Sequence, residues 1–176
     1  MIFTELELPG AYVVDVETHE DERGHFARIF DDAEFGALDL QTYWPQISVA
    51  FNEELGTLRG LHYQEQPHDE AKLVRCVRGS LHDVIVDLRP DSPTFKRWAG
   101  VPLSAASGRM LYVPEGLAHG YLTLEDETEA LYLISAPYVA EAGRGVRWDD
   151  PAFGIEWPAD PRVMSDKDTA WPDFIR

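Results

Sequence analysis

Short apolar segments divided by turn residues are the feature that most limits the fold of this chain. The segments are roughly five to nine residues long, and Gly, Pro, Asp or Asn separates most of them. Regularly spaced short strands of this kind predict an all-β sandwich or barrel. Helical periodicity is weak, and only residues 31–40 predict a helical turn or two, beginning at a capping Asp. The predicted strands lie in 11–18, 25–30, 46–51, 58–64, 72–79, 81–89, 95–104, 109–116, 119–126 and 130–138.

The domain organisation follows from length and from the absence of dividers. The chain has 176 residues without a sequence repeat, a low-complexity segment or a linker, so we expect one domain over 1–176. From about residue 140 the sequence is rich in Trp, Pro and Asp and has too little alternation to make a sheet. We expect a short helical or irregular tail, whose tryptophans pack across the barrel or against a second subunit.

Composition excludes some classes of partner. The net charge is −17, from 32 acidic against 15 basic residues, and such a surface repels the phosphate backbone of nucleic acids. No apolar run reaches the roughly eighteen residues that span a membrane, and the acidic N-terminus does not read as a signal peptide. The single cysteine, Cys76, cannot form an internal disulfide, so we expect a cytoplasmic protein.

Cationic side chains interrupt two of the predicted strands. Lys72 lies in an apolar strand, where its charge requires a partner or a ligand. Arg59 and His62 have opposite parity in the strand 58–64, so they normally point to opposite faces. They can face one cavity only where the strand bulges or twists, and Gly60 is suited to that.

Three of these polar strand residues make a set suited to proton transfer. If His62, Lys72 and Tyr132 face inward, His62 can remove a proton, Lys72 can hold the developing negative charge, and Tyr132 can return a proton. That chemistry suits abstraction of a proton next to a carbonyl group. His62 and Tyr132 each have a structural interpretation as well, since a single His or Tyr in a core strand is commonly a packed residue with a satisfied hydrogen bond.

A metal site is the alternative use of the histidines. His119 follows a Pro-Glu-Gly turn, and two histidine-bearing strands in a small barrel can hold a metal through imidazole and carboxylate ligands. The ligands would be His62, Glu65, His68 and His119. The His-x-His spacing usual in metal-binding cupins is missing here, so we expect no metal and no other cofactor.

Several motifs in a fixed order resemble one enzyme family. The run RGLHYQ, KLVRC, DVIVDLR, SPTF, VPEGLAHGYL, RGVRWDDP and SDKD, preceded by DERGHFARIF, is similar to the nucleotide-sugar 3,5-epimerases typified by dTDP-4-dehydrorhamnose 3,5-epimerase. The match covers nearly the whole chain. It implies a metal-independent cupin, or double-stranded β-helix, that acts as a homodimer on a nucleoside-diphosphate 4-keto-6-deoxy sugar.

The resemblance also implies roles for single residues. His62 matches the family's catalytic base, Lys72 the residue that stabilises the enolate oxygen, and Tyr132 the general acid. Asp168 matches the carboxylate that orients the histidine, a role that the resemblance alone supplies. Positions that contact the nucleotide, the diphosphate or the sugar are matched by Arg23, Phe26, Gln46, Ser48, Arg59, His119, Tyr138 and Lys167.

The chain departs from the family pattern at nucleotide and sugar positions. Arg28 and Gly143 each stand where the family commonly has Glu, and Ser48 stands where it commonly has Asn. The proton-transfer set is unchanged, so the sequence predicts epimerisation at C3 and C5 and leaves the base open. The alternatives are a single-centre epimerase of a GDP- or CDP-linked keto sugar, a ketoisomerase, and a non-catalytic or metal-dependent sugar-binding cupin.

Overall fold

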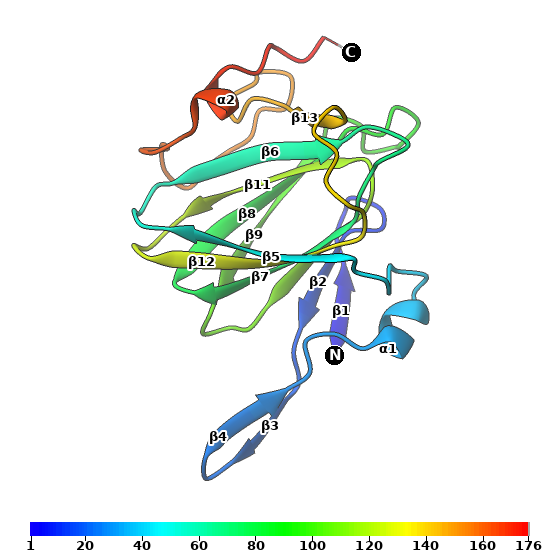
Figure 1. Cartoon of the computed structure of the whole chain (residues 1–176), viewed down its shortest axis with the longest axis vertical. Coiled ribbons are helices and arrows are strands. Elements are labelled where there is room, and N and C mark those ends of the chain that lie inside the picture. Colours follow the sequence, from blue (N-terminus) through cyan, green and yellow to red (C-terminus); the bar gives the residue numbers. More distant parts are fainter. Residues whose placement is uncertain (176) are drawn as a thin grey trace.

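Two antiparallel sheets facing each other form the body of the protein (Figure 1). The computed structural model describes residues 1–175. One sheet has the strand order β1-β2-β10-β7-β12-β5 and the other the order β13-β6-β11-β8-β9. The prediction of an all-β jelly-roll barrel of the cupin type is therefore confirmed. The strands are β1 (Ile2–Glu5), β2 (Tyr12–Asp15), β3 (Thr18–Asp21), β4 (Gly24–Ala27), β5 (Gln46–Asn52), β6 (Leu58–Gln64), β7 (Lys72–Arg78), β8 (Ser80–Asp87), β9 (Trp98–Ser104), β10 (Met110–Val113), β11 (Leu117–Thr123), β12 (Thr128–Ile134) and β13 (Gly143–Gly145).

The main core fills the space between the two sheets. Inward residues of both sheets, among them Val74, Ile85, Leu111 and Tyr121, are almost fully buried there. A second cluster lies on the outer side of the six-stranded sheet, where Phe35 of the short helix α1 (Asp32–Gly36) packs. As the sequence predicts, α1 begins at a capping residue: the carboxylate of Asp31 accepts hydrogen bonds from the first turn.

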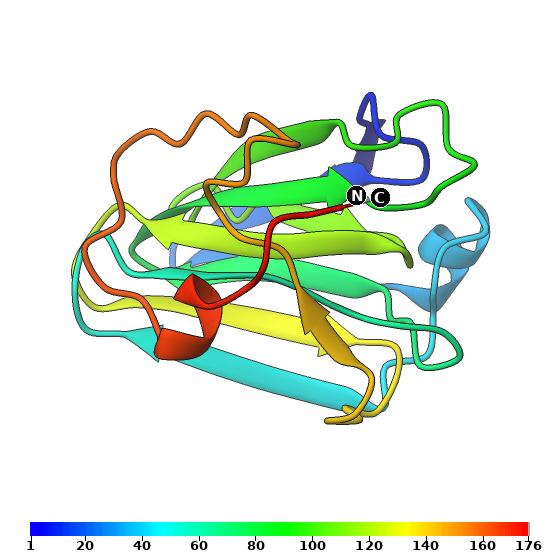
Figure 2. The ribbon, with the colours of Figure 1, turned by 90° about the horizontal axis from the view of Figure 1, so that it is seen from above.

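The C-terminal tail covers the outer face of the five-stranded sheet (Figure 2). Trp148 and Trp157 pack there, so the tail tryptophans lie across the barrel. The prediction that the tail adds no strand is wrong at β13, which pairs with β6. Its sequence, Gly-Arg-Gly, has no apolar alternation, and the strand exists because its backbone pairs with a neighbour. The short helix α2 (Asp166–Thr169) follows near the end of the chain.

The β3–β4 hairpin projects away from the barrel (Figure 1). Its strands pair only with each other in the described part of the chain, and Phe26 is 67% exposed. Such exposure of a large aromatic side chain is unusual unless another surface covers it. Within residues 1–175, no helix has the length and apolar character needed to cross a membrane.

Candidate active site

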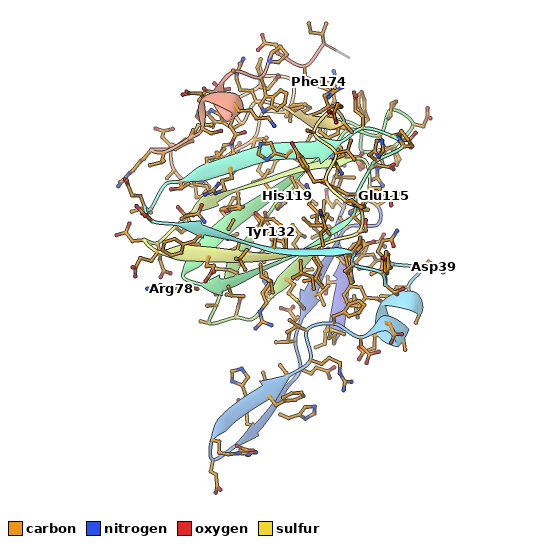
Figure 3. The ribbon with its side chains drawn as sticks, viewed as in Figure 1. Asp39, Arg78, Glu115, His119, Tyr132 and Phe174 are labelled. Atoms are coloured by element: carbon orange, nitrogen blue, oxygen red, sulfur yellow. The ribbon has the colours of Figure 1, made fainter. Side chains whose placement is uncertain are left out.

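A cavity of about 660 Å³ lies inside the barrel, between the two sheets and beneath the tail. His119 and Tyr132 lie in the middle of the barrel (Figure 3). Most of the predicted site residues line this cavity, although they come from strands far apart in the sequence. These are Gln46, Ser48, Arg59, His62, Lys72, His119, Tyr132, Tyr138, Lys167 and Asp168.

A bulge in β6 lets Arg59 and His62 face the same cavity. His119 of β11 lies opposite His62, and Tyr121 lies opposite Arg59, so β6 has one more residue between these pairs than β11. Gly60 lies in the bulge with a φ of 130°. A Cβ atom there would lie 2.5 Å from the Cα of Gly120, so glycine is required where the two strands approach. The predicted irregularity at Gly60 is confirmed.

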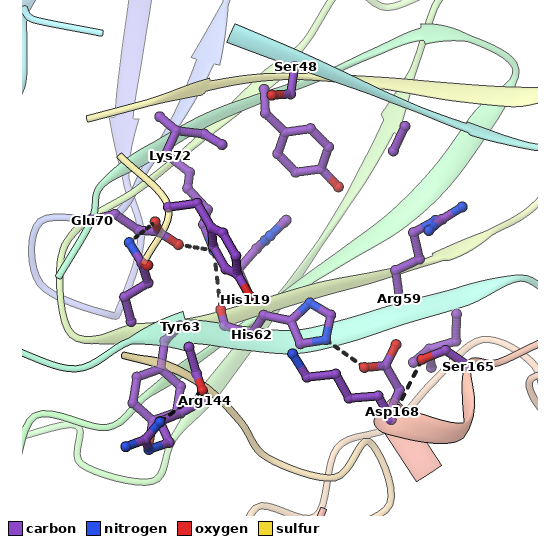
Figure 4. A pocket seen from close by; sticks show the side chains of 18 of the residues that line it. Ser48, Arg59, His62, Tyr63, Glu70, Lys72, His119, Arg144, Ser165 and Asp168 are labelled. Carbon is purple, nitrogen blue, oxygen red and sulfur yellow. Dashed lines mark hydrogen bonds and ion pairs between the residues drawn. The ribbon is translucent and has the colours of Figure 1, made fainter. Parts of the chain in front are cut away.

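His62 and Asp168 form a hydrogen-bonded pair at the cavity wall (Figure 4). The Nε2 atom of His62 lies 2.5 Å from Oδ1 of Asp168. The backbone of Asp168 is fixed at the start of α2, because its N–H donates to the hydroxyl of the capping residue Ser165. Its side chain is 5% exposed, whereas that of His62 is 42% exposed. The imidazole is thus fixed at one nitrogen and open to the cavity.

The carboxyl group of Asp168 is kept in its charged form. Burial by itself raises the pKa of this carboxyl, but the hydrogen bond and charge of His62, with the Gly60 N–H, outweigh burial and lower the pKa below its usual value. A charged carboxylate at Nε2 fixes the orientation of the ring. It also favours the imidazolium that forms when the other nitrogen takes up a proton.

Docking of the tail brings Asp168 to His62. The backbone N–H of Arg162 donates to Gly56 O at 2.8 Å, and the N–H of Leu58 donates to Val163 O at 2.9 Å. These bonds pair the tail with the start of β6, and α2 begins three residues after Val163. The pair His62–Asp168 therefore depends on contacts between segments about a hundred residues apart.

Lys72 lies in the cavity wall beside the backbone of His62. Its Nζ atom donates to the carbonyl of His62 at 3.2 Å and lies 3.1 Å from Oε1 of Glu70. The other oxygen of Glu70 accepts from Gln64 Nε2 at 2.7 Å. The ammonium group has a third N–H direction, which leaves it able to donate to an oxygen in the cavity.

Tyr132 lies across the cavity on β12, in the opposite sheet from His62. Burial is the largest cause of a pKa raised well above the usual value of a phenol, and the charge of Asp83 and a hydrogen bond with Tyr121 act in the same direction. The hydroxyl group is therefore protonated at neutral pH and can donate. Its ring packs edge-on against His119, with 5.9 Å between ring centroids.

The remaining polar residues are fixed by neighbours. His119 Nε2 lies 2.5 Å from Oδ1 of the buried Asp83. Arg59 Nε donates to Asn52 Oδ1 at 2.7 Å, which leaves part of the guanidinium open to the cavity. Gln46 accepts from the backbone N–H of Tyr138 at 3.0 Å, so it also positions that ring.

Arg23 and Phe26 do not lie in the cavity of their own chain. Both belong to the projecting β3–β4 hairpin, where Arg23 forms an ion pair with Asp21 and is largely exposed. Arg28 pairs with Asp31 at 3.2 Å, also away from the cavity. Ser48 and Gly143, the other two departures from the family pattern, line the cavity wall.

The four residues of the alternative metal site are divided between other partners. His62 and His119 each bond an aspartate, and Glu65 pairs with Arg144 at 2.9 Å. His68 is exposed. Among residues 1–175, no three His, Cys, Asp or Glu side chains gather in an arrangement that holds a metal ion.

Comparison with known proteins gives the family. The family model described as dTDP-4-dehydrorhamnose 3,5-epimerase matches residues 5–175. The chain belongs to this family. The family resemblance drawn from the motifs is confirmed, and with it the prediction that the protein is a nucleotide-sugar epimerase.

Relatives of the chain match nearly its whole length. The dTDP-4-dehydrorhamnose 3,5-epimerase of Sinorhizobium fredii is 40% identical, over 99% of this chain and 90% of that protein. The crystal structure of the enzyme of that name from Bacillus anthracis, with TDP and pyrophosphate bound, has a TM-score of 0.94 at 38% identity and covers 98% of this chain and 99% of that chain. A 3'-monoepimerase of Streptomyces bikiniensis, in complex with dTDP-quinovose, has a TM-score of 0.88 at 37% identity and covers 96% and 85%.

The sequence did not predict three residues of this epimerase site: Glu70, Asp83 and Arg144. Glu70 lies two residues before β7 begins, so strand alternation gives no signal for it. Asp83 gives no signal either, because its pairing with His119 depends on the register of β8 against β11. Arg144 of β13 was missed together with its strand.

Proposed function

We propose that this chain converts dTDP-4-dehydro-6-deoxyglucose to dTDP-4-dehydrorhamnose by inverting C3 and C5. The observation that carries the proposal is the placement of a His–Asp pair and a protonated tyrosine on opposite sheets around one cavity, with a lysine in the same wall. Inversion at carbon needs a base on one face and an acid on the other. Membership of the family supports this use of the site.

His62 acts as the base. The 4-keto group makes the hydrogens at C3 and C5 acidic, and the exposed edge of the imidazole is the part of the pair that a sugar can reach. The electron pair of the broken C–H bond moves to the C4 oxygen. Asp168, buried and charged, stabilises the imidazolium that results.

Lys72 holds the negative charge of the enolate. Its side chain is 9% exposed, and a charge interaction in such a water-poor wall is stronger than the same interaction in water. Glu70 and the carbonyl of His62 orient the group before substrate arrives. The positive charge therefore meets the enolate oxygen without having to rearrange.

Tyr132 returns the proton on the opposite face. Its raised pKa keeps the phenol protonated at neutral pH, which a general acid requires. Protonation of the enolate carbon from this side inverts the centre. Ser48, which lies opposite Tyr132 on β5, and His119, which packs on its ring, form the walls that orient the sugar.

The nucleoside diphosphate binds at the open side of the cavity. Arg59 and Lys167 are its cationic ligands, because the guanidinium fork and the ammonium group both suit phosphate oxygens. Tyr138, 61% exposed at the cavity edge and held by Gln46, offers a ring on which a base can stack.

The working form is a cytoplasmic homodimer in which Arg23 and Phe26 enter the cavity of the partner subunit. Three observations support the dimer: the hairpin projects, Phe26 is exposed, and a row of apolar side chains is exposed on the edge strand β5. Ile47, Val49 and Phe51 in that row are 64%, 61% and 43% exposed. Apolar edge-strand residues of this kind need a covering surface in solution.

A single-centre epimerase is the second candidate. The 37% identity to a 3'-monoepimerase favours it, and the proton-transfer residues would be the same. Which carbons His62 meets depends on how the sugar is seated. Ser48 and Gly143 line the wall where seating is decided and differ from the common family residues.

The test follows solvent deuterium into the sugar. The purified protein is incubated in heavy water with dTDP-4-dehydro-6-deoxyglucose, and deuterium at C3 and C5 is followed by NMR. Deuterium at both carbons with inversion supports the 3,5-epimerase, and deuterium at one carbon supports the single-centre enzyme. No incorporation with dTDP-, GDP- or CDP-linked keto sugars would overturn the proposal.

A further inference from the structure

Tyr121 lies directly behind the proposed general acid. It is fully buried on β11, does not line the cavity, and its ring centroid is 6.5 Å from that of Tyr132. The side chain of Asn52 partners its hydroxyl: Asn52 Nδ2 donates to the Tyr121 oxygen at 3.1 Å, and the Tyr121 O–H can donate to Asn52 Oδ1 at 3.3 Å.

These contacts form one polar chain through the core. Asn52 is 2% exposed, and its Oδ1 also accepts from Arg59 Nε at 2.7 Å. The hydrogen bonds run from the guanidinium of Arg59 through Asn52 to the Tyr121 hydroxyl, and the ring contact between Tyr121 and Tyr132 continues the chain to the proposed general acid. The core residues around this chain are mostly Leu, Val, Ile and Ala. A phenylalanine at position 121 would pack among them equally well and would need no hydrogen-bonding partner, so packing alone does not explain the hydroxyl.

We propose that Tyr121 is a positioning residue for the inversion step, whose hydroxyl holds the phenol of Tyr132 and stabilises the tyrosinate that proton donation leaves behind. The inference rests on the proposed function, because it assigns Tyr132 the role of general acid. Tyr121 touches no substrate and acts only through Tyr132.

The protons balance over one inversion. His62 takes a proton from the sugar carbon, and the electrons of that C–H bond go to the C4 oxygen. The enolate carbon then takes the proton of the Tyr132 O–H, the new C–H bond forms, and Tyr132 becomes an anion. The Tyr121 O–H turns from Asn52 Oδ1 to donate to this anion, while Asn52 Nδ2 still donates to the Tyr121 oxygen. Solvent then removes the proton from His62 and returns one to Tyr132.

The position of Tyr121 behind Tyr132 means that its hydroxyl affects the proton transfer from Tyr132 and not the proton transfers of His62. A buried phenolate is costly without a donor, so loss of the Tyr121 hydroxyl slows protonation by Tyr132. Proton removal and return by His62 do not involve this hydroxyl. The enolate then goes back to His62 more often than it goes forward to Tyr132.

The test compares exchange with inversion in heavy water. For wild type and Tyr121→Phe, NMR measures deuterium in recovered, uninverted keto sugar and in inverted product. We expect the ratio of exchange to inversion to rise roughly tenfold in Tyr121→Phe, the effect of one lost hydrogen bond to a charged group. Tyr112→Phe is the matched control, since Tyr112 is also a buried tyrosine whose oxygen accepts one hydrogen bond, from Gln41, away from the cavity. It should leave the ratio unchanged.

A second variant keeps the test open if Tyr121→Phe folds poorly. Asn52→Ser breaks the chain one residue further back and should raise the same ratio, with a higher KM because Arg59 loses the side-chain acceptor of its Nε. An unchanged ratio in both variants, with wild type active, would overturn the role of Tyr121 and leave the proposed function standing. Wild type that exchanges no deuterium would overturn both.

Discussion

His119 lies opposite His62 across the β6–β11 ladder, and each imidazole is bonded through Nε2 to a carboxylate at 2.5 Å. The two pairs differ in burial. The side chains of His119 and Asp83 are 4% and 0% exposed, whereas that of His62 is 42% exposed. His119 is therefore a fixed wall against which Tyr132 packs, and His62 is the imidazole that a substrate can meet.

Replacing His62 should remove both exchange and inversion. Asn keeps the polar character and part of the volume but cannot accept a proton, so we expect kcat to fall about 10²–10⁴-fold with a small change in KM. Steady-state kinetics and deuterium incorporation measure this. His68→Asn, at an exposed position outside the cavity, is the matched control and should behave like wild type. Deuterium incorporation at the wild-type rate in His62→Asn would rule out His62 as the base.

Gly60→Ala should destabilise the protein and displace the base. The added Cβ would lie 2.5 Å from Gly120 Cα and 2.9 Å from His119 O, at a φ of 130°. Crowding and backbone strain together should cost about 2–4 kcal/mol in the free energy of unfolding, measured by urea denaturation. Gly24→Ala separates the two effects, because Gly24 has a similar φ of 124° and nothing within 4 Å of its added Cβ. Equal losses in both variants would show that close approach of β6 and β11 does not matter.

Asp87→Asn should lower stability at neutral pH and lose its effect in acid. Burial alone raises the pKa of Asp87, but hydrogen bonds from Arg89, Ser92 and Thr94 lower it to about 2. A carboxyl whose pKa is lowered on folding adds stability above its unfolded value of 3.8, and this stability is lost as the pH falls toward 2. We expect a loss of about 2 kcal/mol at pH 7 that shrinks below pH 4.

The control for that variant lies in the same loop. Asp91 is exposed, so Asp91→Asn should change the free energy of unfolding little at any pH. Urea denaturation from pH 7 down to pH 3 measures both variants. If the free energy lost in Asp87→Asn stays constant over this range, the charge of the Asp87 carboxylate is not what stabilises the protein at this position.

Sequence periodicity predicted the strands well and the site only in part. Alternation located β6 at its observed bounds, and the parity conflict between Arg59 and His62 correctly pointed to an irregularity at Gly60. Alternation carries no information on contacts between distant segments, so Asp168 came from family resemblance alone. β3 and β13 were missed because neither contains an apolar residue to give a pattern, and β1 was missed as well.

The last prediction concerns the projecting hairpin. If Arg23 serves the partner's cavity, Arg23→Ala should lower activity although the residue lies outside the cavity of its own chain. Mixing Arg23→Ala with His62→Asn dimers and letting the subunits exchange then restores activity. One cavity of each mixed dimer carries both defects, and the other carries neither. Random exchange should recover about a quarter of wild-type activity.

Subunit exchange distinguishes the two possible placements of Arg23. If Arg23 acted in its own chain, every cavity of a mixed dimer would carry one defect, and mixing would restore nothing. Asp21→Ala is a useful companion, since it frees Arg23 from its ion pair on the hairpin without removing the guanidinium. By itself, Asp21→Ala should keep its activity, because the guanidinium of Arg23 is still present to enter the partner's cavity. Activity that returns on mixing, and does not return when crosslinking blocks subunit exchange, would assign the hairpin to the partner's site. If dimers that have exchanged subunits show no recovered activity, that assignment is refuted.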